Sequence, residues 1–157
     1  MTILNNKKIL RSRSSAQTRR IGAGIGARLR PGDVVALRGE LGSGKTTLVK
    51  GIAGALGVNE REVSSPTFAL VHEYRGKSKI YHIDWYRLGR VSGADASLAE
   101  ECFGSDAITL VEWAERGRAL LPPNRIEIHL KHAGGNRRII TLYPWSPKHE
   151  KLFRDIT

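Results

Sequence analysis

The chain has a single cysteine, Cys102, among its 157 residues. This excludes an intrachain disulfide and a cysteine-rich metal site, and it is typical of proteins in a reducing compartment. The five histidines are scattered without an HxxxH spacing, so no zinc site is expected. No apolar run approaches the roughly 20 residues that a membrane span requires, and we therefore expect a soluble, cytoplasmic protein with no membrane contact.

Acidic residues are missing from the first 32 positions, which contain eight Lys and Arg. Residues 33–123 are nearly balanced, whereas residues 124–157 contain seven bases and three acids, so the formal net charge of +11 comes from the two ends. Clusters of Lys and Arg gain affinity for a polyanion by releasing its counterions, which points to a phosphate-rich partner. The alternative is that these residues form only a solvated basic face.

An Arg- and Ser-rich start of this kind could also be a transit peptide. Against that, "SSAQTRRIGAGIGARLR" (14–30) is typical of a helix, because Ile21, Ile25 and Leu29 fall on one stripe. No long apolar segment follows the first charges, so we expect no secretory signal. The helix is predicted to belong to the domain, and residues 1–14 can then form a flexible basic arm.

The rest of the chain alternates between strand-like and helix-like segments. An apolar run at 33–38 predicts a buried strand, and the amphipathic segment 46–56 predicts a helix that ends at Gly57. Further elements are expected as a strand at 107–113, hairpins of 67–74 with 79–84 and of 125–130 with 137–143, and helices at 95–103 and 147–156. This order predicts one α/β domain over residues 1–157, a P-loop NTPase-like three-layer fold with a mixed central sheet and added β-hairpins.

Between the first predicted strand and its helix, the chain reads "GELGSGKT" (39–46), which matches the P-loop pattern GxxxxGK[ST]. The glycines let successive backbone N–H groups point at phosphate oxygens, and the following helix adds the positive end of its dipole. Lys45 would reach the β- and γ-phosphates of a nucleotide, and the Thr46 hydroxyl would hold Mg²⁺. The position between a buried strand and an amphipathic helix disfavours a chance match.

Three further segments carry groups that nucleotide chemistry needs. The stretch "SSPTF" (64–68) lies where many P-loop proteins place a phosphate-sensing switch, although it could be an ordinary Ser-Pro turn. Asp84 ends a strand and could hold a water molecule bound to Mg²⁺ or orient the water molecule that attacks the phosphate. The alternative is that Asp84 caps a helix or forms an ion pair with Arg87. Glu112 ends another strand and is a candidate Mg²⁺ ligand, and the next residue, Trp113, could lie against the base of a nucleotide. The alternative is that Glu112 is only a charged strand end and Trp113 a core residue.

With these segments in order, the chain resembles the TsaE family (also called YjeE), ATPases of bacterial tRNA threonylcarbamoyladenosine synthesis. The matching pieces are "GELGSGKTTLVKGIAGALG", "SSPTFALVHEY", "YHIDWYRL", "ITLVEWAER" and "LLPPNRIEIHL". The resemblance implies a compact domain that binds ATP and Mg²⁺ and hydrolyses ATP weakly alone. It also implies two partner proteins, TsaD and TsaB, which transfer a threonylcarbamoyl group to tRNA, and the basic ends could then contact that tRNA.

The same resemblance implies a role for particular residues. Catalysis would depend on Lys45, Asp84 and Glu112, and Mg²⁺ would be held by Thr46 and Glu112. The nucleotide would be bound by Trp113 and by the loop from Glu40 to Thr47, namely Glu40, Leu41, Gly42, Ser43, Gly44, Lys45, Thr46 and Thr47.

Some positions depart from the usual family pattern. Trp85 replaces a common leucine, and Ala114 replaces a proline often found after the tryptophan. Ser14 and Ser15 stand where the family often has an acid near the nucleotide, which leaves the N-terminal wall of the pocket undefined.

Two other classes of protein compete with this interpretation. A small-molecule kinase shares the P-loop and the size, and "LGRVSGADA" (88–96) or "HAGGNRR" (132–138) could serve as its Arg-bearing lid. A nucleic-acid-binding module without enzymatic activity would explain the charge but not the P-loop with its ordered acids. A GTPase is disfavoured, because the chain has no NKxD or TKxD stretch to read guanine.

Overall fold

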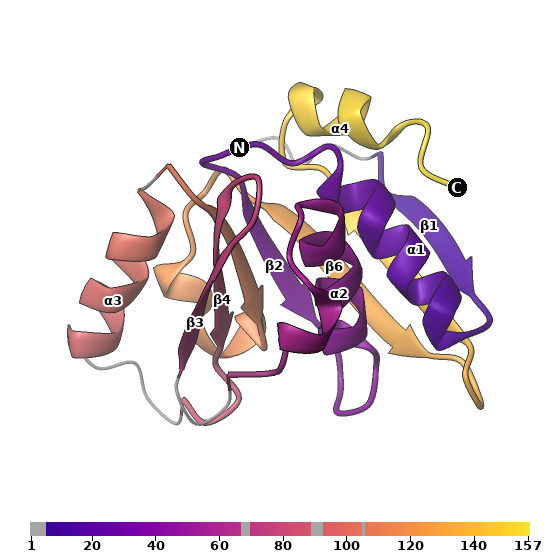
Figure 1. Ribbon diagram of the computed structural model, residues 1–157, viewed down its shortest axis with the longest axis horizontal. Coiled ribbons are helices and arrows are strands. Elements are labelled where there is room, and N and C mark those ends of the chain that lie inside the picture. Colours follow the sequence, from indigo (N-terminus) through magenta and orange to yellow (C-terminus); the bar gives the residue numbers. More distant parts are fainter. Residues whose placement is uncertain (1–5, 67–69, 89–92, 105) are drawn as a thin grey trace.

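Seven strands form one mixed sheet in the part of the chain that the computed structural model describes, residues 6–66, 70–88, 93–104 and 106–157 (Figure 1). The strand order is β1-β7-β6-β2-β5-β4-β3. The strands are β1 (Lys8–Ser12), β2 (Val34–Arg38), β3 (Val71–Arg75), β4 (Lys79–Asp84), β5 (Ile108–Glu112), β6 (Ile126–His132) and β7 (Arg138–Tyr143). The helices are α1 (Ser15–Gly26), α2 (Lys45–Ala55), α3 (Gly93–Phe103) and α4 (Pro147–Phe153), with 3-10 segments η1 (Glu60–Glu62) and η2 (Ala114–Leu120).

The middle of the sheet is parallel and its edges are antiparallel. Strands β6, β2, β5 and β4 run parallel to one another, whereas β3 pairs with β4, β7 with β6 and β1 with β7 in antiparallel fashion. All five residues of β5 and four of the five in β2 are buried, as expected for strands covered on both faces. Because these strands are parallel, their carboxyl ends meet at one edge, where such sheets place their ligands.

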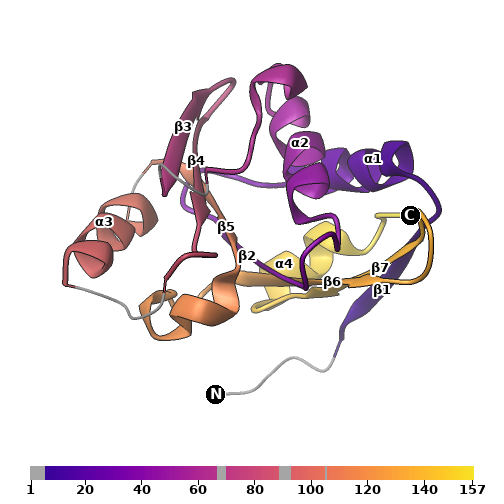
Figure 2. The same cartoon turned by 90° about the horizontal axis from the view of Figure 1, so that it is seen from below.

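Helices α1 and α2 lie side by side on one face of the sheet (Figures 1 and 2). Their apolar residues join those of β2, β5 and β6 and Phe153 of α4 in the larger of the two hydrophobic clusters that the described residues form. Glycine lets the two helices approach backbone to backbone: a Cβ at Gly51 would lie 2.0 Å from the Arg19 carbonyl oxygen, and one at Gly22 would lie 2.4 Å from that of Leu48. This close packing fixes the start of α2, and with it the loop before it.

The opposite face of β2, β4 and β5 is covered by α3 and η2, which completes three layers (Figure 2). Trp85, 3% exposed, packs here within the second hydrophobic cluster and lies against Gly117, where a Cβ would meet its ring at 2.6 Å. The tryptophan that replaces the family's leucine is therefore a core residue.

Most predicted elements are present, with ends shifted by a few residues. The fold class and both predicted hairpins are confirmed, although residues 67–69 of the first hairpin lie outside the described residues. The prediction of a flexible arm over residues 1–14 is wrong for residues 8–14. Strand β1 pairs with β7, and Ser14 caps α1 by accepting a hydrogen bond from the Gln17 amide. Within the described ranges, none of the helices combines the length and apolar character needed to cross a membrane.

Candidate functional site

The loop between β2 and α2 turns sharply and exposes the start of the helix. Gly44 precedes α2 with a φ of 102°, in the left-handed region that glycine favours, and no side chain caps the helix. The first N–H groups of a helix have no partner within it, and together with the helix dipole they form an anion site. Gly39 allows the loop to pass close to β6, since a Cβ there would lie 2.5 Å from the Leu130 carbonyl oxygen.

Lys45, the first residue of α2, is folded back over this loop. Its ammonium donates hydrogen bonds to the carbonyl oxygens of Gly39 and Glu40, the second at 3.0 Å, and lies 3.4 Å from the Ser43 hydroxyl. Burial lowers the pKa of Lys45, and the nearby carboxylates of Glu112 and Asp84 oppose that shift. The cation thus lies inside the loop, at 5% exposure, where a phosphate would be received.

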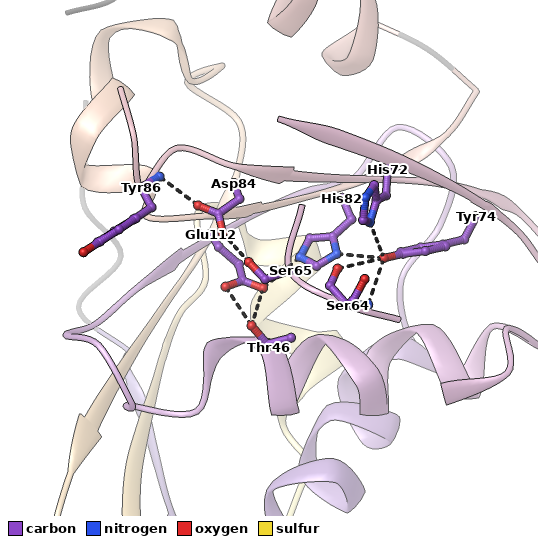
Figure 3. Close-up of polar contacts among 9 residues, drawn as sticks. All are labelled: Thr46, Ser64, Ser65, His72, Tyr74, His82, Asp84, Tyr86 and Glu112. Carbon is purple, nitrogen blue, oxygen red and sulfur yellow. Dashed lines mark hydrogen bonds and ion pairs between the residues drawn. The ribbon is translucent and has the colours of Figure 1, made fainter. Parts of the chain in front are cut away.

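Thr46 and Glu112 meet across the gap between α2 and β5 (Figure 3). The Thr46 hydroxyl lies 2.9 Å and 3.0 Å from the two carboxylate oxygens of Glu112, which is 2% exposed. Glu112 is the last residue of β5, so the sheet sets its height relative to the loop. Hydroxyl and carboxylate oxygens are hard ligands of the kind that Mg²⁺ prefers.

Asp84 stands beside Glu112 because the two residues are register partners at the ends of the parallel strands β4 and β5. The Asp84 carboxylate accepts one hydrogen bond from the Tyr86 amide at 2.7 Å and another from the Ser65 hydroxyl. It is 1% exposed. A loop that follows α2 in sequence therefore contacts the second acid directly through Ser65. The role of "SSPTF" as a phosphate-sensing switch stays a prediction, and Thr67 and Phe68 lie outside the described residues.

Trp113 follows Glu112 in a left-handed conformation, with φ 56° and ψ 39°. Its ring packs against Tyr86 with centroids 4.9 Å apart, and the Arg116 guanidinium lies 5.2 Å from its centroid. The Lys45 ammonium lies 3.9 Å from the same centroid. The tryptophan is thus half-buried at the edge of the site and not within the core.

These groups surround one cleft of about 420 Å³. It is lined by Leu41, Gly42, Ser43, Gly44, Lys45, Thr46, Thr47, Ser65, Asp84, Tyr86, Glu112, Trp113 and Arg138. All of the residues expected from the sequence line it except Glu40, which contributes its carbonyl oxygen to Lys45.

Arg138 lines the cleft but was not among the site residues expected for a TsaE-like protein; it belongs to "HAGGNRR" (132–138), which was considered above only as the Arg-bearing lid of a kinase. It begins β7 and donates a hydrogen bond at 2.9 Å to the carbonyl oxygen of Gly42, which lies 96 positions earlier in the chain. The sequence holds no signal for the contact with Gly42 itself, because it depends on how β7 packs beside the loop.

A divalent ion of the magnesium type fits the donor set around Thr46. Among the described residues, no group of three or more His, Cys, Asp and Glu side chains could hold a metal by itself. Mg²⁺ is usually bound by one or two protein oxygens together with substrate phosphates and waters, and seldom by a complete protein cage. One hydroxyl and one carboxylate beside an anion-binding loop provide that partial set.

The strand–loop–helix unit, with an acid at the end of each of two neighbouring parallel strands, defines an α/β protein of P-loop NTPase-like architecture. The family model "Threonylcarbamoyl adenosine biosynthesis protein TsaE" matches residues 12–140, and the chain belongs to the TsaE family.

Individual relatives agree with this assignment. The chain is 42% identical over 129 residues to the tRNA threonylcarbamoyladenosine biosynthesis protein TsaE of Treponema pallidum. The aligned region covers 82% of this chain and 95% of that protein. It is 39% identical over 142 residues to the TsaE of Bacillus subtilis, covering 90% and 88% of the two chains. The crystal structure of Bacillus subtilis YdiB superposes with a TM-score of 0.76 at 32% identity, covering 96% of this chain and 94% of that one.

Proposed function

We propose that the protein is the Mg²⁺-dependent ATP-binding and ATP-hydrolysing component of the machinery that makes N6-threonylcarbamoyladenosine in tRNA, acting with TsaD and TsaB. The observation that carries the proposal is the contact of the Thr46 hydroxyl with the Glu112 carboxylate at the mouth of the glycine-rich loop. It brings a P-loop hydroxyl, a strand-end acid and an anion-binding helix start to one point. Membership of the TsaE family supplies the pathway.

Binding would use groups that are already in place. The N–H groups at the start of α2 would hold the phosphates, and the Lys45 ammonium would exchange its contacts with the carbonyl oxygens of Gly39 and Glu40 for β- and γ-phosphate oxygens. Thr46 and Glu112 would hold Mg²⁺, which when bound neutralises charge on the phosphates. The indole of Trp113 would lie beside the nucleotide.

Hydrolysis would depend mainly on Asp84. Its carboxylate can accept a hydrogen bond from a water molecule and aim the oxygen at the γ-phosphorus. As the new P–O bond forms, the bond to the β-phosphate oxygen breaks, and the water's proton ends on the released phosphate. Because Asp84 also accepts from Ser65 and from the Tyr86 amide, its orientation depends on the loop that carries Ser65.

The basic ends would contact tRNA held by the partner proteins. Lys7, Arg11 and Arg13 are exposed, and Arg11 stands on β1 at the edge of the sheet. Phosphate neutralisation by such residues gives affinity that falls steeply with salt.

The experiment is an assay of phosphate release from ATP with the protein alone, with candidate small-molecule acceptors, and with purified TsaB and TsaD. We expect slow release alone, stimulation by the two proteins together, and no dependence on an acceptor. Transfer of the phosphoryl group to an acceptor would instead identify a small-molecule kinase. A lack of stimulation by TsaB and TsaD would contradict the assigned partnership.

A further inference from the structure

A series of hydrogen bonds behind Glu112 has no role in the mechanism above (Figure 3). The His82 imidazole, which does not line the cleft, lies 2.8 Å through Nε2 from Glu112 Oε1, an oxygen that the Thr46 hydroxyl also contacts. Its Nδ1 lies 3.1 Å from the Tyr74 hydroxyl. That hydroxyl lies 3.2 Å from the Ser64 carbonyl oxygen and 3.4 Å from the Ser64 amide nitrogen.

Both side chains in the middle of this series are shielded from water. His82 is fully buried and Tyr74 is 8% exposed. The antiparallel pairing of β3 with β4 places them on the same face, above α2, where Tyr74 joins the larger hydrophobic cluster. Burial raises the pKa of the Tyr74 phenol, which therefore keeps its hydrogen as a donor. Hydrogen bonds shielded in this way constrain their partners more strongly than exposed ones do.

The Tyr74 hydroxyl is a branch point with more neighbours than hydrogens. It has one hydrogen to donate, while the Ser64 carbonyl oxygen, His82 Nδ1 and His72 Nδ1 (at 3.3 Å) all lie within reach. A bond donated to Ser64 is therefore unavailable to His82. A shift of the Ser64 backbone would therefore change which partner the hydroxyl serves, and His82 contacts both that hydroxyl and Glu112.

The same segment reaches the second acid by a separate path. Ser65, the next residue, donates through its hydroxyl to Asp84. The Ser64–Ser65 segment thus contacts Asp84 directly and Glu112 through Tyr74 and His82. Both acids of the cleft are tied to two adjacent residues that follow α2 and η1 in the chain.

We propose that Tyr74 and His82 are positioning residues that couple the Ser64–Ser65 segment to Glu112, so that the two acids of the cleft reach their working positions together. The inference rests on the proposed function, since Glu112 is the metal-holding group there. Residues that orient a metal ligand commonly change metal affinity or activity by about 10–100-fold when they are removed.

The test uses small changes that separate the two halves of the series. Tyr74→Phe removes only the hydroxyl, and His82→Gln keeps an amide near the position of Nε2 to contact Glu112 but gives up Nδ1. His82→Asn does the opposite, since its shorter amide stays near the position of Nδ1. Tyr81→Phe is the matched control, because Tyr81 neighbours His82 on β4 but packs with the cluster on the opposite face of the sheet.

For each variant, the measurements are kcat and KM for ATP, nucleotide affinity with and without Mg²⁺, and the Mg²⁺ concentration at half-maximal binding. We expect Tyr74→Phe and His82→Gln to lower kcat about 10-fold or more while metal-free nucleotide affinity stays unchanged. Tyr81→Phe should match wild type. His82→Asn should in addition raise the Mg²⁺ requirement, because it releases Glu112. The double variant Tyr74→Phe/His82→Gln should have a kcat no lower than that of either single variant, because both changes break the same contact between the Tyr74 hydroxyl and His82 Nδ1.

A second readout does not depend on turnover. In wild type, adding ADP and Mg²⁺ should change amide hydrogen exchange of a peptide that contains Ser64 and Ser65, and this change should be smaller in Tyr74→Phe, which keeps only the path from Ser65 to Asp84. Equal exchange changes in both proteins, or losses of kcat that multiply in the double variant, would overturn the coupling. If wild type binds Mg²⁺ and ADP but releases no phosphate from ATP, the proposed function fails while the exchange comparison still decides the coupling. Thermal unfolding of each variant identifies any loss that comes from misfolding.

Discussion

The Lys45 ammonium lies over the indole of Trp113, 3.9 Å from the centroid of the ring. A cation at this distance is attracted by the ring face and also changes the surroundings of the chromophore. If phosphates draw Lys45 toward themselves, the indole loses this neighbour and gains a nucleotide. We therefore predict that the pair reports occupation of the cleft as a change in fluorescence.

We expect ATP with Mg²⁺ to change the tryptophan fluorescence of wild type and to leave that of Trp113→Phe unchanged. Trp85 is a core residue and Trp145 packs against the Arg125 guanidinium at 4.8 Å, so both should be silent. The measurement is a fluorescence titration, with Trp145→Phe as the control that keeps the signal. A signal that persists in Trp113→Phe would place the reporter elsewhere.

Lys45→Ala should abolish tight ATP binding, because it removes the cation that would face the β- and γ-phosphates in the proposed function. Thr46→Ala should reduce mainly hydrolysis, since it removes one oxygen from the Mg²⁺ set, and Thr46→Ser should restore it. Calorimetric titration with ATP in the presence and absence of Mg²⁺ separates these effects. An unchanged affinity in Lys45→Ala would contradict the assignment of the loop.

Asp84→Ala should retain nucleotide and hydrolyse it at least about tenfold more slowly, which corresponds to roughly 1.4 kcal/mol in the barrier. The reason is that a group orienting water acts mostly in the transition state, so its loss lowers turnover more than affinity. Single-turnover phosphate release and equilibrium binding give the two numbers. Turnover at the wild-type rate would show that Asp84 does not orient the attacking water, and would leave it a structural role such as holding the Tyr86 amide and Ser65.

Glu127 should make the free energy of unfolding depend on pH in the acid range. The His129 imidazole, together with the Arg125 and Arg38 guanidinium groups, holds the pKa of Glu127 at about 2, below the ordinary 4.5 and against the effect of burial. A depressed carboxyl pKa stabilises the fold fully above about pH 4.5, and this contribution is lost as the pH falls toward 2.

Glu127→Gln should therefore cost on the order of 2–3 kcal/mol at pH 7, and the difference from wild type should shrink steadily below about pH 4.5. Denaturant unfolding at a series of pH values measures it. Glu62→Gln, a change at an exposed position of η1, is the control. A difference that does not vary between pH 7 and pH 3 would show that Glu127→Gln acts through packing and not through charge.

The basic start of the chain should matter for a polyanion and not for ATP. Lys8 donates to the Arg154 carbonyl oxygen at 2.7 Å and is best kept, so the variant replaces Lys7, Arg11 and Arg13 with serine. We expect unchanged ATP affinity but weaker binding to tRNA, or to TsaB and TsaD loaded with it. The slope of log K against log salt should become shallower by about 0.7–0.9 for each phosphate that the variant no longer neutralises. Parallel salt titrations with identical slopes would show that these residues form only a solvated face.

The sequence predicts those features that depend on local pattern. Apolar runs and glycine turns locate the central strands, and the rule that the carboxyl ends of parallel strands meet at one edge is enough to bring Asp84 and Glu112 together. Side chains alternate between the two faces of a strand, so His82 lies on the same face as Asp84, two residues later. The sequence itself therefore indicates that the His82 side chain lies near the acids.

What the sequence could not predict are contacts made by pairing partners far apart in the chain. Strand β1 is short, basic and half exposed, so nothing in "KILRS" distinguishes an edge strand from an arm until β7 is available to pair with it. The contact of Arg138 with Gly42 and the branch point at Tyr74 depend in the same way on tertiary packing.

The register of Asp84 with Glu112 has a consequence for how the chain tolerates change in length. The spacing of the two carboxylates is set by the pairing of β4 with β5, and α3, which lies in the connection between these strands, is outside that pairing. Insertions and deletions around α3 should therefore leave the acids where they are. A single residue inserted within either strand would turn one carboxylate to the opposite face of the sheet and separate the pair.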